Sequence, residues 1–503
     1  MHTHTQPAIG GFHPDPSICR VGDDYYLATS SFEYFPGIPI HHSTDLHHWT
    51  LIGNVLTRPG QVELPDRLPP SAGVFAPTLR HHNGLFHLIT TVLGGGGTFL
   101  FTSPDAAGPW SDPVPVPGVT GIDPDLAWDD DGTCYCTWAG IHQIRIDPIT
   151  GDSQDVPRTL YSGTGGSFPE GPHLHRRGPW WYLVLAEGGT GPGHAVSVAR
   201  STSPQGPFEP HPNNPVLTHR GTNNPVQNTG HADLVEAPDA SWWMVHLGVR
   251  PRGAFPSWHT LGRETFLAPV TWTDDGWPVI GAPTGPTSAA APLWYDDFAT
   301  PALRPQWVAP GLTAHRNVNV TERPGRLTLH ARPATEPPVF IGRRQQHPSC
   351  TVRAAVDASR GSGGLALRMD DRHLYALVIE DGQVHVDARI GPLAQRLRSV
   401  PCPTDSAVLE IQVTATPVID LEADDSGHGV ASIPVEAIER ITSSGPDRVQ
   451  LIAETQGHRT LLAELDGRYL STEVTGGFTG RLAGLLATRG TVRTEWFSYE
   501  PAP

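Results

Sequence analysis

The chain is poor in the residues that build disulfide frameworks, metal–thiolate sites and membrane spans. Its 503 residues include only five cysteines, an odd number with scattered spacing, which excludes a regular disulfide framework or a cysteine-based zinc site. No run of 18 apolar residues occurs, so no membrane-spanning helix is expected. The first residues, MHTHTQPAIGG, lack a basic stretch followed by an apolar one. We therefore expect no signal peptide and a cytoplasmic protein with free thiols.

Positive charge is also scarce. Lysine and arginine number 34 against 51 aspartates and glutamates, which gives a formal net charge of −17. This surplus argues against nucleic-acid and anionic-membrane partners and suits a neutral ligand. The four glycines at 94–97 are not followed by a Lys-Ser or Lys-Thr pair, so they predict a loop and not a phosphate cradle. No Ser-His-Asp spacing and no cysteine nucleophile stands out.

Helical periodicity is nearly absent, and the residues that abound are typical of β-structure. The 54 glycines and 52 prolines make up about a fifth of the chain, as turn-rich β-proteins require. Apolar and polar residues often alternate with a period of two. Fourteen tryptophans and 26 histidines are unusually many. Flat aromatic rings are surfaces on which sugars stack, although most of these side chains are expected in the core.

A local unit recurs five times between residue 1 and about residue 282. Each copy closes on Leu or Ile, and an aromatic strand follows seven to nine residues later. The closing residues are Ile18, Leu79, Leu126, Leu174 and Leu234. The strands centre on Tyr26, Phe86, Tyr135, Tyr182 and Trp243. Their spacing of 47 to 61 residues accommodates a four-stranded blade with its loops, so we predict a five-bladed β-propeller at 1–285.

The repeat also aligns candidate functional residues. The positions three before the closing residues are Asp15, Ala76, Asp123, Gly171 and His231, and Glu170 lies one place earlier than this register. Equivalent positions of a repeat lie at equivalent points around the axis, so we expect the acids and the histidine to converge. An isolated Asp before Pro is more often a turn residue. Asp15 and Asp123 share one phase of the repeat and have apolar neighbours, whereas His231 is equally compatible with a buried core histidine.

Three converging carboxyl groups can hydrolyse a glycosidic bond. One carboxylate must be ionised to take a proton from water, while a second carboxyl must stay protonated to donate to the leaving oxygen. A third nearby charge can hold the two pKa values apart. Asp15, Asp123 and Glu170 supply this set, and Glu187 is a rival for the acid role whose place at a strand end favours a supporting one.

The remainder of the chain has a different character. The stretch GAPTGPTSAAAP at 281–292 is small and flexible in composition, and we place a linker at 286–295. Six or more alternating strands follow over about 200 residues, with a single plausible helical turn at 435–441. We predict a β-sandwich at 296–503.

With these features in view, residues 6–282 resemble glycoside hydrolase family 43, five-bladed propeller enzymes that act on xylan side chains and xylo-oligosaccharides. The similar segments, in order, are GFHPDPSICRVGDDYYLATSSFEYFPGIPIHHSTDLHHW, IDPDLAWDDDG, EGPHL, AEGGT, GHADLVE and LGRETFLAPVTW. The segments FIGRRQQH and DGRYLSTEVTGGFTG resemble the concanavalin A-like β-sandwich appended to the β-xylosidase branch. The resemblance therefore covers nearly the whole chain.

The resemblance implies a role for each aligned residue. Asp15 would be the general base, Glu170 the general acid, and Asp123 the residue that orients the acid and tunes its pKa, in a single displacement that inverts the anomeric carbon. The other residues implied to bind substrate are Phe32, Phe75, His231, Arg263 and Phe478. The sequence departs from the family where Phe75 replaces a common Trp and Asp125 a commoner Ser.

These features predict an exo-acting hydrolase that releases D-xylose from the non-reducing end of β-1,4-xylo-oligosaccharides. An α-L-arabinofuranosidase, alone or as a second activity, is the alternative, because a hydrophobic wall discriminates the two sugars only weakly. A carbohydrate-binding propeller without catalysis is more distant, since it would not need three converging acids.

The same resemblance sets expectations for cofactors and partners. It implies no organic cofactor, and it allows Ca²⁺ or another divalent ion held through water near His231. The expected partners are xylo-oligosaccharides or arabinose-substituted oligosaccharides, without nucleic acid or membrane, and a homo-oligomer is compatible with the family.

Overall fold

The computed structural model describes residues 6–65, 68–286, 292–312, 316–417 and 443–502. The chain forms two compact units. The first comprises Met1–Val249, Arg263–Ser288 and Pro310–Leu312, and the second comprises Arg250–Gly262, Ala289–Ala309 and Thr313–Pro503. The helical turn predicted at 435–441 and the centre of the predicted linker lie outside the described residues. No helix in the described ranges is long and apolar enough to cross a membrane.

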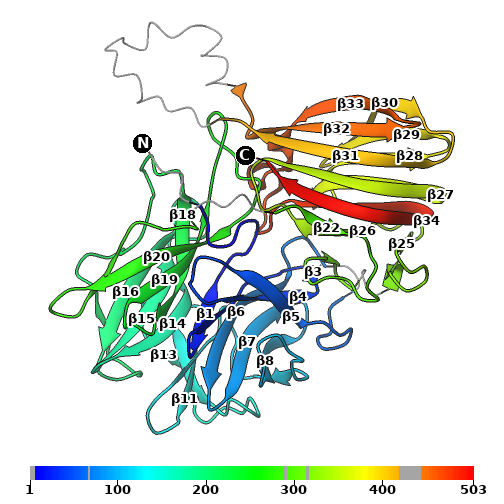
Figure 1. The fold of residues 1–503 in the computed structure, drawn as a ribbon. Helices are drawn as coiled ribbons and strands as arrows, with labels where there is room; N and C mark the ends of the chain where they lie inside the picture. The colour runs from blue at the N-terminus through cyan, green and yellow to red at the C-terminus, as the bar shows by residue number, and fades with distance from the viewer. Residues whose placement is uncertain (1–5, 66–67, 287–291, 313–315, 418–442, 503) are drawn as a thin grey trace, which may run out of the picture. The chain divides into compact units, whose positions relative to one another are not determined.

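The described residues of the first unit form five four-stranded antiparallel sheets (Figure 1). Blade 1 contains β1 (Ser17–Val21), β2 (Asp24–Ala28), β4 (Gly37–Ser43) and β5 (Thr50–Leu56), with the short β3 (Tyr34–Phe35) in a loop. Blade 2 contains β6 (Gly73–His82), β7 (Leu85–Leu93), β8 (Gly97–Ser103) and β9 (Val114–Pro115). Blade 3 contains β10 (Asp125–Trp128), β11 (Cys134–Trp138), β12 (His142–Ile146) and β13 (Arg158–Thr159). Blade 4 contains β14 (Glu170–Arg177), β15 (Trp180–Glu187), β16 (Ala195–Ser201) and β17 (Glu209–Pro210). Blade 5 contains β18 (Gln227–Glu236), β19 (Trp242–Val249), β20 (Glu264–Trp272) and β21 (Pro278–Ile280).

The five sheets close into a ring, which confirms the predicted five-bladed propeller. The first strands of the blades contact one another in the order β1, β6, β10, β14, β18 and back to β1. Each closing residue of the sequence repeat lies in one of these inner strands and is buried. Each aromatic strand centre lies in the second strand of the same blade. The turns that join the pairs use left-handed residues, such as Asn83 and Gly84 between β6 and β7.

The closing residues are apolar because they fill the gaps between blades. Among the described residues, five hydrophobic clusters each join two neighbouring blades. Leu79 lies in the cluster between blades 1 and 2, and Leu126 in the next cluster around the ring. Ile18 lies in the cluster between blades 5 and 1, which closes the ring. A repeat that ends on Leu or Ile therefore supplies one buried anchor per interface, and burial of each such side chain stabilises the ring by roughly 1.5–3 kcal/mol.

A seam of hydrogen bonds joins the start of the chain to blade 5. Ile9 and Thr265 exchange backbone hydrogen bonds of 3.1 and 3.2 Å, and the His13 amide donates to the Arg263 carbonyl at 3.0 Å. The Gly11 amide donates to Glu264 Oε1 at 3.0 Å. This seam fixes the segment before β1 against Arg263 and the start of β20, and both stretches carry residues of the predicted site.

The described part of the second unit is a twelve-stranded antiparallel sheet folded into a sandwich. Its strands are β22 (Trp294–Asp296), β24 (Val318–Asn319), β25 (Leu327–His330), β26 (Val339–Arg344), β27 (Cys350–Asp370), β28 (His373–Glu380), β29 (Gln383–Ile390), β30 (Leu393–Pro401), β31 (Ser406–Ala415), β32 (Asp447–Thr455), β33 (His458–Asp466) and β34 (Leu482–Pro501). Its short elements are the 3₁₀ helix η2 (Gly467–Leu470) and the helix α3 (Thr472–Thr475), and the short strand β23 (Ala309–Pro310) lies where the chain passes from the second unit to the first.

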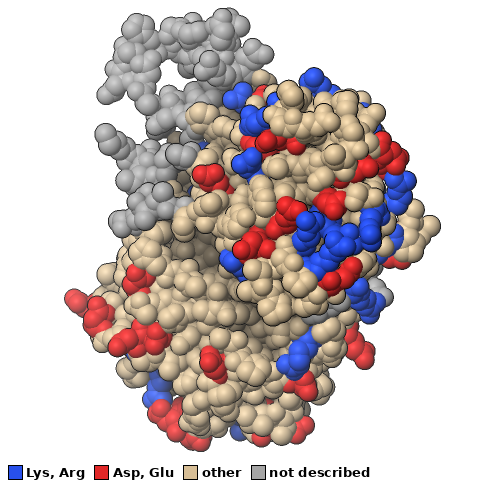
Figure 2. Space-filling view, turned by 45° about the vertical axis from the view of Figure 1, so that its right-hand side comes forward, with Lys and Arg blue, Asp and Glu red and all other residues tan. Residues whose placement is uncertain are grey.

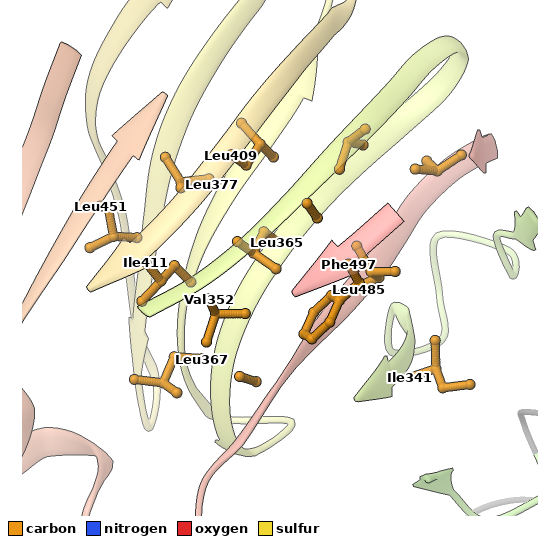
Figure 3. Close-up of a cluster of buried hydrophobic side chains, with 14 of the residues drawn as sticks. Ile341, Val352, Leu365, Leu367, Leu377, Leu409, Ile411, Leu451, Leu485 and Phe497 are labelled. Carbon is orange, nitrogen blue, oxygen red and sulfur yellow. The ribbon is translucent and has the colours of Figure 1, made fainter. Parts of the chain in front are cut away.

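Two long strands belong to both layers of this sandwich. The first half of β27 pairs with β31 and its second half with β28, and the register between β27 and β34 shifts near Asp357 and Arg360. The inward side chains of both halves fill one core, in which Leu365, Leu377 and Phe497 are fully buried (Figure 3). All five cysteines of the chain are described, and each is buried and unpaired. On the face shown in Figure 2, acidic and basic side chains are interspersed with uncharged surface.

Candidate active site

The predicted site residues share an unusual backbone conformation. Of the five positions three before the closing residues, four have positive φ: Asp15 at 56°, Asp123 at 58°, Gly171 at 54° and His231 at 46°. Residues other than glycine avoid this region, and such strain is concentrated at functional sites. The inner strands β14 and β18 are irregular at the same places, between Glu170 and His173 and between Gly230 and Asp233. Irregularities of this kind re-aim side chains away from the ladder and are frequent next to active sites.

Asp15 lies at the centre of a set of positive and polar groups. Arg263 Nη1 donates to Asp15 Oδ1 at 2.8 Å, and Ser30 Oγ donates to Asp15 Oδ2 at 2.6 Å. His231 Nδ1 lies 3.6 Å from Asp15 Oδ1. Burial alone would raise the pKa of Asp15, but the Arg263 charge, His231 and the Ser30 hydrogen bond hold that pKa below its ordinary value. Asp15 is therefore a carboxylate at neutral pH, the state that a general base requires.

Glu170 has the opposite tendency. Burial, reinforced by the negative charge of Asp15, raises the pKa of Glu170 to about 7, although Arg263 opposes the shift. Burial also raises the pKa of Asp123 well above its ordinary value, and the charges of Glu170 and Asp15 act in the same direction. The Gly171 amide donates to Asp123 Oδ2 at 3.2 Å, which ties Asp123 to the backbone next to Glu170. The site thus holds the ionised carboxylate of Asp15 and, with it, the pair Asp123 and Glu170, which retains a proton near neutral pH.

Arg263 connects Asp15 to a pair of aromatic rings. Arg263 Nη1 also donates to Thr190 Oγ1 at 3.2 Å, and its guanidinium carbon lies 5.7 Å from the ring centroid of Phe32. The Phe32 and Phe75 rings meet edge to face with centroids 5.3 Å apart. Phe32 is buried, whereas Phe75 is half-buried. The structure therefore places Phe32 beside the arginine that holds Asp15, and Phe75 against Phe32.

His231 is packed tightly and is neutral. Burial lowers its pKa to about 4 despite the nearby Asp15 charge. A Cβ atom added at Gly171 would lie 3.0 Å from the His231 ring, so glycine is needed at that position. Within the described ranges, no group of three or more His, Cys, Asp or Glu is placed to hold a metal ion. An ion held through water near His231 stays a prediction.

Comparison with known proteins shows the family of this chain. Residues 4–278 match the model of glycosyl hydrolases family 43, and residues 295–500 match the β-xylosidase C-terminal concanavalin A-like domain. The chain belongs to glycoside hydrolase family 43. It is an all-β hydrolase in which the family propeller is followed by the family sandwich, which confirms both the resemblance and the predicted fold class.

Several relatives of this family 43 enzyme align over nearly their whole length. A non-reducing end α-L-arabinofuranosidase of Bacteroides ovatus is 37% identical over 99% of this chain and 94% of its own. A xylosidase/arabinosidase of Butyrivibrio fibrisolvens is 34% identical over 96% of this chain and 95% of its own. Among solved structures, a xylan β-1,4-xylosidase of Bacillus halodurans superposes with a TM-score of 0.82 at 29% identity, covering 99% of both chains.

Two further residues were considered from the sequence of this family 43 chain: Glu187 for the acid role and Phe478 for substrate binding. Glu187, the rival acid, accepts hydrogen bonds from the Thr164 amide at 2.8 Å and the Thr164 hydroxyl at 2.7 Å, so its carboxylate holds a loop. Phe478 belongs to the second unit, where it lies between α3 and β34. Its contact with substrate stays a prediction from the resemblance.

The sequence analysis missed a buried ionic network formed by the inner strands. Arg80 donates to Asp125 Oδ1 and to Asp233 Oδ2, each at 2.7 Å. His173 Nδ1 lies 3.0 Å from Arg80 Nη2 and 3.1 Å from Asp125 Oδ1. Asp233 Oδ2 also accepts from the Ser17 hydroxyl at 2.9 Å. Burial opposes ionisation of Asp233, but Arg80 and His173 hold its pKa well below the ordinary value.

A sequence signal for this network existed. Ser17, Asp125, His173 and Asp233 each lie one place before a closing residue. The position directly before the closing residue is polar in every blade, and in blade 2 it is Thr78. The polar residue before each closing residue therefore marks four of the network's side chains, two places after the position that carries Asp15, Asp123 and His231.

The pKa of Glu170 predicts a pH dependence. We expect kcat/KM to fall as pH rises through about 7, because the acid then loses the proton it must donate. The acidic limb should lie below pH 4, because the pKa of Asp15 is lowered from 3.8. The alkaline midpoint belongs to the Asp123–Glu170 pair as a whole. A pH–rate profile on a glycoside with an unactivated leaving group measures both limbs, and an alkaline midpoint near 4.5 would contradict the assignment of Glu170.

Proposed function

We propose that this family 43 hydrolase removes single D-xylose units from the non-reducing end of β-1,4-xylo-oligosaccharides, with inversion. The observation that carries the proposal is the contrast between two buried carboxyl groups: Arg263 and Ser30 bind Asp15 and lower its pKa, whereas burial raises the pKa of Glu170 to about 7. Inversion needs one carboxylate to activate water and one carboxylic acid to protonate the leaving oxygen. Relatives named xylosidase and xylosidase/arabinosidase support xylose as the sugar.

In the proposed mechanism each residue acts on a stated atom. Asp15 takes a proton from the attacking water, and Arg263 and Ser30 keep the carboxylate oriented through the two oxygens that they contact. As water bonds to the anomeric carbon, Glu170 gives its proton to the glycosidic oxygen, and the bond to the leaving sugar breaks. Asp123, which accepts a hydrogen bond from the Gly171 amide, keeps the backbone next to Glu170 in place. Burial and the negative charge of Asp15 help Glu170 to retain its proton. No step requires an organic cofactor.

A second activity on α-L-arabinofuranosides is favoured by one observation. The Bacteroides ovatus relative at 37% identity carries the name non-reducing end α-L-arabinofuranosidase. The wall formed by Phe32 and Phe75 is apolar, and a wall of this kind separates similar sugars by small factors only. We propose arabinofuranosidase activity as secondary to xylosidase activity.

Initial rates on nitrophenyl β-D-xyloside and nitrophenyl α-L-arabinofuranoside test this order. We expect the larger kcat/KM on the xyloside, and proton NMR of the fresh product should show α-xylose before mutarotation. A larger value on the arabinofuranoside would reverse the order of the two activities. If β-xylose appeared first, the base role of Asp15 would be wrong. A purified chain that released no sugar from any glycoside would instead be a binding propeller.

A further inference from the structure

An exposed phenylalanine stands next to the proposed acid. Phe168 lies two residues before Glu170, and 72% of it is exposed. A single exposed apolar side chain is ordinary on a protein surface. Phe168 also has φ of 52°, a left-handed conformation that bulky side chains rarely adopt. Phe32, in the wall beside Arg263, has the same kind of backbone at φ 50°.

The backbone on both sides of Phe168 is tethered. The Ser167 carbonyl accepts from the Gly188 amide at 2.7 Å, and the Pro169 carbonyl accepts from the Gly140 amide at 2.8 Å. Gly140 belongs to the connection between β11 and β12, and Gly188 follows β15. Because two neighbouring loops hold the flanking residues, the chain cannot relax Phe168 into an ordinary conformation. The fold therefore presents this ring to solvent at the cost of strain, a pattern associated with functional positions.

The loop beneath the ring leads directly to the site. A Cβ atom added at Gly189 would lie 3.3 Å from Phe168 Cδ2, so the ring rests on this glycine. The next residue, Thr190, accepts the hydrogen bond from Arg263, and Arg263 holds Asp15. Phe168 therefore connects to Asp15 through the loop that contains Gly189 and Thr190, and it precedes Glu170 by two residues. All of these residues belong to the first unit.

We propose that Phe168 is the stacking platform for the leaving sugar, the unit on the reducing side of the scissile bond. The inference rests on the proposed function and names a specificity-determining residue for it. An acid that protonates the leaving oxygen must face the leaving group, so the chain beside Glu170 borders the space into which that sugar departs. A β-xylopyranose ring presents flat C–H faces, and a rigid aromatic ring binds such a face at low entropic cost.

The test compares leaving groups in the variant Phe168→Ala. We expect kcat/KM on xylotriose to fall about tenfold, the size of one aromatic packing contact. Hydrolysis of β-D-xylosyl fluoride should keep its wild-type rate, because fluoride has no ring to stack. Phe168→Trp should retain xylotriose turnover. Leu393→Ala is the matched control, since Leu393 of β30 is 71% exposed, and it should change neither substrate.

A second variant separates stacking from loop collapse. Phe168→Gly should raise the melting temperature, because glycine adopts positive φ without strain, and it should lose as much xylotriose turnover as the alanine variant. Equal losses on xylotriose and xylosyl fluoride, or no loss on either, would overturn the stacking role while leaving the proposed function intact. A wild-type enzyme inactive on both substrates would overturn the proposed function and this inference together.

Discussion

Replacing Asp15 with asparagine is expected to lower kcat by about 10³-fold, within the range that general base catalysis contributes. The amide keeps the shape of the side chain, and its oxygen can still accept from Arg263, but it cannot take a proton from water. The loss should be similar for substrates with good and poor leaving groups, because water must be activated in every case. Initial rates on xylotriose and dinitrophenyl β-xyloside measure it.

Azide provides the control for Asp15→Asn. Azide is already deprotonated, so it needs no base, and it should restore turnover of dinitrophenyl β-xyloside and give α-xylosyl azide. The variant also exchanges a carboxylate for a neutral group beside the buried Arg263, so a modest loss of stability is expected in a thermal melt. An Asp15→Asn enzyme with near wild-type kcat, or one whose azide product is the β anomer, would contradict the base assignment.

Glu170→Gln is expected to show a loss that depends on the leaving group. Turnover of xylotriose should fall by about 10³- to 10⁴-fold, because a sugar alkoxide leaves only with a proton. Turnover of dinitrophenyl β-xyloside should fall less than about tenfold, because that phenolate leaves without help. The pair of substrates measured on one variant therefore separates acid catalysis from general damage to the site.

The fold of this variant should be intact. The pKa of Glu170 is raised by folding, so its contribution to stability is present at low pH and is lost as pH rises through about 7. A neutral glutamine avoids that loss, and Glu170→Gln should melt at or above the wild-type temperature at pH 8. For Glu170→Gln acting on dinitrophenyl β-xyloside, the plot of rate against pH should also lose its alkaline limb. Equal losses on both substrates would contradict the acid role.

The ring of blades was predictable because its physics is local and repeated. Each blade needs an apolar anchor such as Leu126 in its inner strand and an aromatic residue such as Tyr135 in the next strand. This pair of residues recurs five times in the sequence. The convergence of Asp15 and Asp123 followed from the same register. Glu170 breaks the register by one place, since Gly171 occupies the left-handed position and packs against His231.

The network around Arg80 was not predictable in the same way. Its position, one after the closing residue, holds Cys19, Ala127, His175 and Val235 in the other blades, so the repeat does not mark it. Arg80 finds Asp125 and Asp233 only when the ring is closed, because 45 and 153 residues separate them in sequence. The surroundings of Glu187 depend likewise on Thr164, which no motif connects to it.

The seam between the start of the chain and blade 5 has a consequence for biosynthesis. Asp15 and its partner Arg263 are 248 residues apart, and Arg263 directly precedes β20. A nascent chain therefore carries the base without its counter-ion, and the ring stays open, until the ribosome has passed the fifth blade. Premature termination anywhere before that point yields fragments that lack the paired base, so hydrolysis begins only after the last blade docks onto the first.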